Sequence, residues 1–348
     1  YTMIMGYPGR TTRFQTSPEL KLQIAQNDVR IAARTIRQNV LLEDMLADPK
    51  IKIQYASKYA SSSNGWKKWQ GMKLAFDKLD IIGRAEQEEA DFQRWVESDK
   101  KLKAKYGSAV ADLADAVEAG KEANIAFTKS FETIYKIEAT GFAINLATAA
   151  NRAIKNGTDT VAALNKAYEI LAPKYADYSA DTDRKVAKAM LEHYRDIAST
   201  EYAQMLASID IDQFVNDIYD NSAFTSAEAL KAAIDEKGMG IFEDPAYTKG
   251  YEMYMECVNG QLKTLETEDH LAAARKLYTA GLLEWRKGQP SYPDANFTMR
   301  LTYGNVGGYS PKDAVVYKHY TTLDGVMEKE DPDNWEFVVP EKLKELWK

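Results

Sequence analysis

The chain has 348 residues, of which 45% are hydrophobic and 28% are charged, and its formal net charge is -7. This length and composition are typical of a globular protein with about two domains. The negative charge argues against a nucleic-acid partner, because phosphate binding requires a basic face. No apolar run reaches the ~18 residues of a membrane-spanning helix, so we expect no membrane partner.

The few cysteine and histidine residues restrict metal and thiol chemistry. Cys257 is the single cysteine, which excludes an internal disulfide and a cysteine-based metal cage. It lies among apolar residues, as a buried thiol does, and not in the electropositive surroundings of a nucleophile. The three histidines are His193, His270 and His319, and their number and spacing disfavour a metal-dependent helical enzyme. We therefore expect no metal and no cofactor.

The first part of the chain predicts short strands followed by long helices. Residues 1–14 alternate apolar and turn residues, which is typical of short strands. A helix is predicted over 17–47, because it opens with the start signal Ser-Pro and ends before Asp-Pro. A second helix is predicted from 49, with an interruption at 61–65 by the poor helix formers Ser-Ser-Ser-Asn-Gly, and it resumes over 66–103.

The remainder of the chain continues the helical pattern and then leaves it. Further helices are predicted at 122–155, 158–171, 181–206, 245–262 and 267–287, because apolar residues recur there near a helical period. From residue 293 the pattern changes, and 297–303 alternates with a period of two, as a strand does. The tail at 339–348 again predicts a helix.

This order of elements predicts a mainly α fold in which a helical domain interrupts a β-domain. We expect residues 1–14 to be a fragment of a β-barrel host, 15–290 a helical domain, and 291–348 a fragment of a second β-barrel. The two β-type ends are too short to close a barrel by themselves. The chain is therefore expected to be an internal fragment of a longer protein.

One stretch stands out for chemistry, YASKYASSSNGWKKW at 55–69. A serine-rich break between aromatic-bearing helices is a poor way to build a bundle, but it is suited to presenting the side chain of Asn64. A solvated kink between two helices is the simpler interpretation of the same composition. The residues alone leave both interpretations open.

Three segments together resemble the periplasmic bacterial serine dipeptidyl-peptidases of the dipeptidyl-peptidase seven and eleven type. They are GYPGRTTRF at 6–14, YASKYASSSNGWKKWQGM at 55–72, and YPDANFTMRLTYGNVGGYSPKDAV at 292–315 with TTLDGVMEKE at 321–330. The resemblance implies a chymotrypsin-like double β-barrel with an inserted helical domain that caps the active-site cleft. It also implies that the catalytic His and Asp lie before this chain and the nucleophilic Ser after it, so the fragment itself is expected to be inactive.

The resemblance further implies a role for Asn64. A dipeptidyl-peptidase must hold the free amino group of its substrate at a fixed distance from the nucleophile, and a charged amine buried there needs acceptors. The family uses an asparagine of this motif for that purpose, and Asn64 is the matching position. Tyr59, Trp66 and Trp69 are candidates for supporting it or lining a subsite. Gly65 departs from the family pattern, in which a bulkier and often aromatic residue is expected.

The expected partners are thus peptides with a free N-terminus, and the expected location is periplasmic or secreted. The resemblance also allows a homodimer of the full-length parent. Closure of the cap would use hinges near 14–17 and 288–293. The alternative is a helical module without enzymatic function that binds a peptide or a partner helix in a groove.

Overall fold

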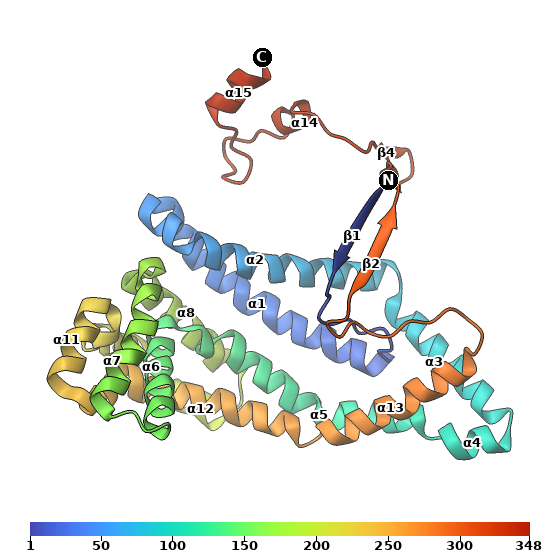
Figure 1. Ribbon diagram of the computed structural model, residues 1–348, viewed down its shortest axis with the longest axis horizontal. Coiled ribbons are helices and arrows are strands. Elements are labelled where there is room, and N and C mark those ends of the chain that lie inside the picture. The colour runs from blue at the N-terminus through green and yellow to red at the C-terminus, as the bar shows by residue number, and fades with distance from the viewer. The chain divides into compact units, whose positions relative to one another are not determined.

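The structure is a computed structural model that describes residues 1–348, and it divides into two compact units. One unit comprises Tyr1–Arg13 and Ser291–Lys348, and the other comprises Phe14–Pro290. These boundaries fall at or next to the positions drawn from the sequence. Figure 1 labels the elements of both units, and each unit is described by itself below.

The larger unit is entirely helical, as the periodicity predicts, and the mainly α fold class is confirmed. Its α-helices are α1 (Ser17–Ala47), α2 (Pro49–Lys78), α3 (Ile81–Glu97), α4 (Lys100–Tyr106), α5 (Ala109–Glu132), α6 (Glu138–Lys155), α7 (Thr160–Leu171), α8 (Ala180–Ile197), α9 (Glu201–Ala207), α10 (Ile211–Asp220), α11 (Ala227–Lys237), α12 (Pro245–Leu265) and α13 (Glu268–Trp285). Short 3-10 helices connect some of them: η1 (Ile134–Lys136), η2 (Ala172–Asp177), η3 (Ala223–Thr225) and η4 (Gly238–Glu243). None of these helices combines the length and the apolar character that crossing a bilayer requires.

The long helices of this unit are stacked on one another. Helix α1 packs against α2 on one side and against α5 on another, and α5 in turn packs against α12 and α13 (Figure 1). Helix α2 lies on the outside of this stack, because Tyr55, Ser62 and Ser63 are its buried residues. An outer helix held from one side presents most of its side chains to solvent, which is the position that a binding residue needs.

Three hydrophobic cores hold the helical unit together. The largest core contains side chains from every helix from α6 to α12, and Phe142, Leu146 and Tyr194 are among its buried residues. A second core lies between α3, α4, α5 and α13 around Phe92, which is fully buried. A smaller core beneath α2 packs Tyr55 against Leu41 of α1 and other apolar residues. Most of the buried side chains of α6 belong to the largest core.

The start of α1 is fixed by side chains from other helices. Its N-cap is Thr16, not Ser17 as the sequence suggested, and Glu19 closes the capping box by accepting from the Thr16 N–H at 2.8 Å. Glu19 also pairs with Arg275 of α13 at 2.5 Å. Ser17 donates its hydroxyl to Glu89 of α3 at 2.9 Å. These bonds restrict the backbone from Thr16 onward, so a hinge at 14–17 would have to move before Thr16. The hinge itself stays a prediction.

The predicted interruption at 61–65 is wrong, because α2 continues through it from Pro49 to Lys78. Low helix propensity is a weak preference that tertiary packing overrides. Here Ser62 and Ser63 are buried against α1, and their small side chains allow the two helices to approach closely. The same stretch that looked like a kink is a helix-packing surface.

Other predicted helices are divided more finely than periodicity suggested. The helix expected over 122–155 is two, α5 and α6, separated at Thr133, whose φ of -110° and ψ of -94° leave the helical region. Asp183 of α8 caps the new start, accepting from the Glu138 and Ala139 N–H groups at 2.9 and 2.8 Å. The helix expected over 66–103 likewise becomes the end of α2, then α3 and α4.

The smaller unit contains the strands. Strand β1 (Thr2–Gly6) pairs antiparallel with β2 (Arg300–Gly304), with Thr2 opposite Gly304. Strands β3 (Tyr309–Lys312) and β4 (Val315–Tyr317) form a second antiparallel pair, and two short helices follow, α14 (Asp324–Met327) and α15 (Glu341–Trp347). The two ends of the chain, expected as pieces of separate barrels, are thus neighbours in one sheet. Their assignment to β-barrels stays a prediction.

Candidate functional site

Asn64 lies on the exposed side of α2, one residue after the buried Ser62–Ser63 pair. Its side chain makes no hydrogen bond within the chain. An amide offers two acceptor sites on its oxygen and two donors on its nitrogen, and all of them are available to a ligand here. The side chain of Asn64 is thus exposed, on a continuous helix and not at a kink, while its role in binding stays a prediction.

Ser62, two residues before Asn64, is held by three side chains of α1, one at its carbonyl oxygen and two at its hydroxyl. Arg34 donates from Nη1 to the carbonyl oxygen of Ser62 at 3.1 Å. The Ser62 hydroxyl accepts from Arg37 Nη2 at 3.3 Å and from Gln38 Nε2 at 3.1 Å. Bonds from charged donors are among the stronger protein hydrogen bonds. The position of Asn64 is therefore set by α1, and not by the flexibility of a loop.

A buried ion pair in turn holds Arg34. Its Nε and Nη2 atoms donate to the two carboxylate oxygens of Glu132, the last residue of α5, at 2.9 and 3.2 Å. The Glu132 side chain is only 4% exposed. A β-carbon at Gly65 would lie 2.6 Å from Arg34 Nη1, closer than real contacts allow. This explains the departure from the family pattern at Gly65: the guanidinium occupies the space that a side chain would need.

The three aromatic candidates near Asn64 contribute to packing. Trp66 donates from Nε1 to Thr35 of α1 at 2.8 Å, and Trp69 stacks on Arg34, whose Cζ lies 4.4 Å from the ring centroid. Tyr59 is partly buried and packs against the small core beneath α2. The faces of these residues are thus engaged with α1 or the core, which favours their supporting role over a role as subsite walls.

Three arginines that were not predicted from the sequence organise this region. Arg30, Arg34 and Arg37 follow one another on one side of α1, where residues three or four apart are neighbours. That spacing was visible in the sequence. Glu132, which pairs with Arg34 and accepts from Arg37 at its carbonyl oxygen, lies nearly a hundred residues further along and could not be identified without the packing of α1 on α5.

No catalytic arrangement is found among the histidines and the cysteine. The His193 Nε2 atom is buried without a hydrogen-bond partner, and burial lowers the pKa of this imidazole. His270 and His319 are exposed. Cys257 is buried, and burial raises the pKa of its thiol, which keeps it protonated. No group of three or more His, Cys, Asp or Glu side chains is arranged to hold a metal ion.

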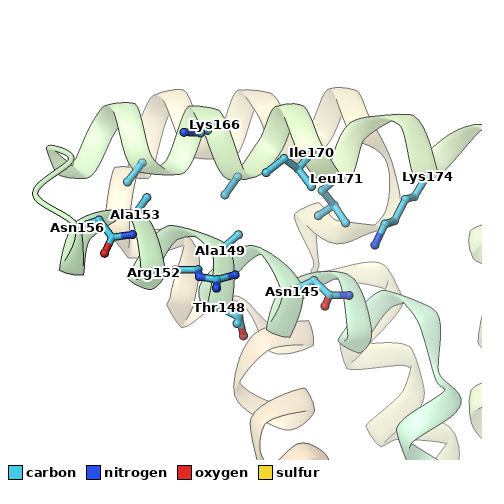
Figure 2. Close-up of a pocket in the computed structure, with 12 residues that line it drawn as sticks. Asn145, Thr148, Ala149, Arg152, Ala153, Asn156, Lys166, Ile170, Leu171 and Lys174 are labelled. Atoms are coloured by element: carbon cyan, nitrogen blue, oxygen red, sulfur yellow. The ribbon is translucent and has the colours of Figure 1, made fainter. Parts of the chain in front are cut away.

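A cleft of about 390 Å³ lies between α6 and α7, and Figure 2 shows its lining. Its floor is apolar and includes Ala149 and Leu171, while Arg152, Lys166 and Lys174 stand around it. All three cations are exposed, so water solvates them and they need no ligand. The lining of the cleft does not include Asn64, and we assign no function to it.

Comparison with known proteins identifies what the chain is similar to. The family model for peptidase S46 matches residues 1–348. The chain is 38% identical over 363 residues to a dipeptidyl-peptidase 7 of Phocaeicola vulgatus, and 36% identical over 362 residues to an Asp/Glu-specific dipeptidyl-peptidase of Porphyromonas gingivalis. In both cases the match covers 100% of this chain and 50% of the relative.

Solved structures give the same result. The crystal structure of Porphyromonas endodontalis DPP11 in complex with the dipeptide Arg-Glu superposes with a TM-score of 0.84 at 32% identity, covering 99% of this chain and 51% of that one. The complex with Arg-Asp gives a TM-score of 0.83. The chain thus spans about half the length of the curated relatives and solved structures that it matches.

Proposed function

Because the chain belongs to the peptidase S46 family, we propose that it is the substrate-capping helical domain of a serine-type dipeptidyl-peptidase, together with short pieces of its β-barrel host. In this proposal the full-length protein releases dipeptides from the free N-terminus of peptides. The catalytic triad lies outside the chain. The names of its relatives and the dipeptides bound in the similar solved structures support a peptide substrate.

The observation that best supports this role of the helical unit is the exposure of Asn64 and its lack of an internal hydrogen-bond partner. An exposed amide without an internal partner lies on a helix in which three charged or polar side chains of α1 hold the neighbouring Ser62. Such pre-organisation reduces the conformational entropy that binding would otherwise cost. The Asn64 oxygen is therefore suited to accept a hydrogen bond from a substrate α-amino group, which is a charged donor.

The strands support the idea that a larger β-structure surrounds them in the full-length protein. The side chains of Met3, Ile4 and Met5 in β1 are more than half exposed, as are Leu301 and Tyr303 in β2. Exposed apolar side chains on a two-stranded ribbon are unfavourable in water. Further strands of a β-barrel would cover them.

Kinetics of the full-length protein test the role of Asn64. Asn64→Ala should lower kcat/KM for dipeptide reporter substrates with a free amino group by a factor that corresponds to about 2–3 kcal/mol, roughly 30- to 150-fold, since it removes one hydrogen bond to a charge. Asn64→Asp keeps an acceptor and should retain much more activity. Substrates with a blocked amino group should react poorly with every variant.

Gln70→Ala is the matched control, because Gln70 is another exposed amide on the same helix. It should change kcat/KM by less than twofold. If Asn64→Ala also changes kcat/KM by less than twofold, Asn64 does not bind the substrate amine and the proposed role is wrong.

The location and assembly of the full-length protein are part of the proposal. We infer a periplasmic or secreted protein, which fractionation of expressing cells would test, and a homodimer, which light scattering after size-exclusion chromatography would test. Recovery in the cytoplasmic fraction, or a monomer at micromolar concentration, would contradict the respective inference.

A further inference from the structure

A cavity of about 180 Å³ lies on the side of α2 opposite Asn64 and forms a second candidate site. Its polar lining comes from four elements: Arg37 of α1, Lys58 and Ser62 of α2, Lys136 of η1, and Glu138 of α6. Tyr55, Leu41 and Val186 complete the wall. Three of the four ionisable Lys, Arg and Glu residues are therefore cations, in a chain whose net charge is -7.

Two of these cations form no ion pair. Lys58 pairs with Glu138, whereas Arg37 and Lys136 interact with the Glu132 carboxylate, which pairs with Arg34, only through its charge. Arg37 donates to the Ser62 hydroxyl at 3.3 Å and to the Glu132 carbonyl at 3.5 Å, but it forms no ion pair. Lys136 makes no hydrogen bond, and its Nζ lies 3.7 Å from the centroid of the Phe131 ring and 5.2 Å from that of the Tyr135 ring.

Some partly buried cations of the helical unit have a carboxylate partner, as Arg34 has in Glu132 and Lys249 has in Asp217, whereas Arg37 and Lys136 face one cavity without an ion pair. Burial lowers the pKa of both Arg37 and Lys136, which means that their charged forms are poorly solvated where they stand. Partly desolvated like charges that face one cavity are unfavourable unless an anion joins them.

The hydroxyl of Ser62 adds a directed donor. Its oxygen accepts hydrogen bonds from Arg37 and Gln38, and these two bonds occupy both of its acceptor sites. Its O–H group donates no hydrogen bond within the chain. A guanidinium, an ammonium and a hydroxyl around one space form a set that recognises oxygen anions. The volume exceeds that of several water molecules at about 30 Å³ each, so a sulfate, phosphate or carboxylate group has room to enter.

We propose that this cavity binds a small oxyanion, a carboxylate, sulfate or phosphate group, between Arg37, Lys136 and Ser62. Asn64 is not part of its lining, so the inference does not depend on the proposed function. Sulfate is the probe of choice because it does not titrate near neutral pH. Inorganic phosphate and acetate serve as further probes, and acetate represents the carboxylate of a peptide.

The test is isothermal titration calorimetry of the full-length protein with sodium sulfate, at an ionic strength held constant with sodium chloride. Saturable binding is expected, and Arg37→Met and Lys136→Met should each weaken it at least tenfold. Lys166→Met is the matched control, since Lys166 is an unpaired lysine at the other cleft, and it should leave the affinity unchanged. Circular dichroism checks the fold; Lys136→Met remains decisive if Arg37→Met does not fold, because Lys136 makes no hydrogen bond.

Competition identifies the source of the anion. If acetate displaces sulfate, the natural ligand is a peptide carboxylate, whereas displacement by phosphate alone indicates a free tetrahedral anion. The absence of saturable heat at constant ionic strength would overturn the proposal. So would an equal loss of affinity in Lys166→Met, because a diffuse positive field and not a built site would then be responsible.

The pH dependence offers a further check. The groups that face Glu138 are Lys58 and Tyr55 from α2, Asp183 from α8, Arg37 from α1, and Tyr178 at the end of η2. Burial, with the nearby Asp183, raises the pKa of Glu138 to about 7. Ionisation above that pH adds a negative charge to the cavity, so sulfate should bind more weakly at pH 8 than at pH 6. Equal affinity at the two values would place the anion away from Glu138 and overturn the proposed location.

Discussion

Two alanine substitutions on the same helix test how closely α1 and α2 pack beneath Asn64. A β-carbon at Gly65 would lie 2.6 Å from Arg34 Nη1 and 3.4 Å from Arg34 Cζ. Arg34 cannot withdraw without lengthening its bonds to Glu132, at 2.9 and 3.2 Å, or to the Ser62 carbonyl at 3.1 Å. At Gly71, by contrast, a β-carbon meets nothing within 4 Å.

The magnitudes follow from these contacts. Weakening one hydrogen bond of a charged donor costs about 1.5–3 kcal/mol, while replacing glycine by alanine inside a helix gains about 1 kcal/mol. Gly65→Ala should therefore lower the free energy of unfolding by about 0.5–2 kcal/mol. Gly71→Ala should raise it by about 0.5–1 kcal/mol, because only the helix propensity changes.

Urea unfolding followed by far-ultraviolet circular dichroism measures both values. Gly65→Ala should also reduce kcat/KM of the full-length protein, because a displaced Arg34 no longer fixes the carbonyl next to Asn64. If Gly65→Ala stabilises the protein as much as Gly71→Ala does, the guanidinium is not in contact with Gly65. The explanation given for the missing side chain at that position would then be wrong.

Three further predictions concern buried polar groups. Glu132→Gln should lower the free energy of unfolding by about 3 kcal/mol in urea titrations, since it breaks a buried ion pair. Asp28→Asn at the exposed pair with Lys73 should have a much smaller effect, because solvent screens that pair. Equal effects of the two substitutions would refute the buried pair. The pKa of Glu138 is raised from 4.5 to about 7, so the folded state binds more protons than the unfolded state in that window, and its contribution to stability is lost as pH rises from 4.5 to 7. Glu138→Gln should reduce this pH-dependent loss by about 2–3 kcal/mol, and an unchanged slope would contradict the assignment. Cys257, which is 4% exposed, should react with a thiol reagent only after unfolding, and fast reaction of the native protein would contradict its burial.

Local sequence signals predicted the helix limits correctly where helix propensity and tertiary packing favour the same structure. The helix predicted over 17–47 coincides with α1, since a start signal, a helical period and a terminal Asp-Pro pair all favour the same limits. At 61–65 they disagree: the serines and glycine disfavour a helix in isolation, but burial against α1 stabilises one. Likewise, the break at Thr133 has no composition signal, because Asp183 on another helix caps the new start.

The candidate site was predictable in part. The composition of its motif left open whether Asn64 is presented to a ligand or lies in a solvated kink, and the resemblance supplied the role that we propose for it. The residues that hold it, Arg34 and Glu132, lie on α1 and α5, and their contact depends on tertiary packing. The cavity lined by Arg37 and Lys136 could not be predicted either, because tertiary packing brings η1 close to α1.

The most direct test of the account is a crystal structure of the full-length protein with a bound dipeptide. The distance between the Asn64 side-chain oxygen and the dipeptide α-amino nitrogen is the quantity to measure. The account predicts a hydrogen bond of about 2.7–3.2 Å, with Ser62 and Arg34 in contact as they are here. An α-amino group bound entirely by other residues, with the Asn64 amide facing solvent, would contradict the claim that this helical unit measures peptides from their N-terminus.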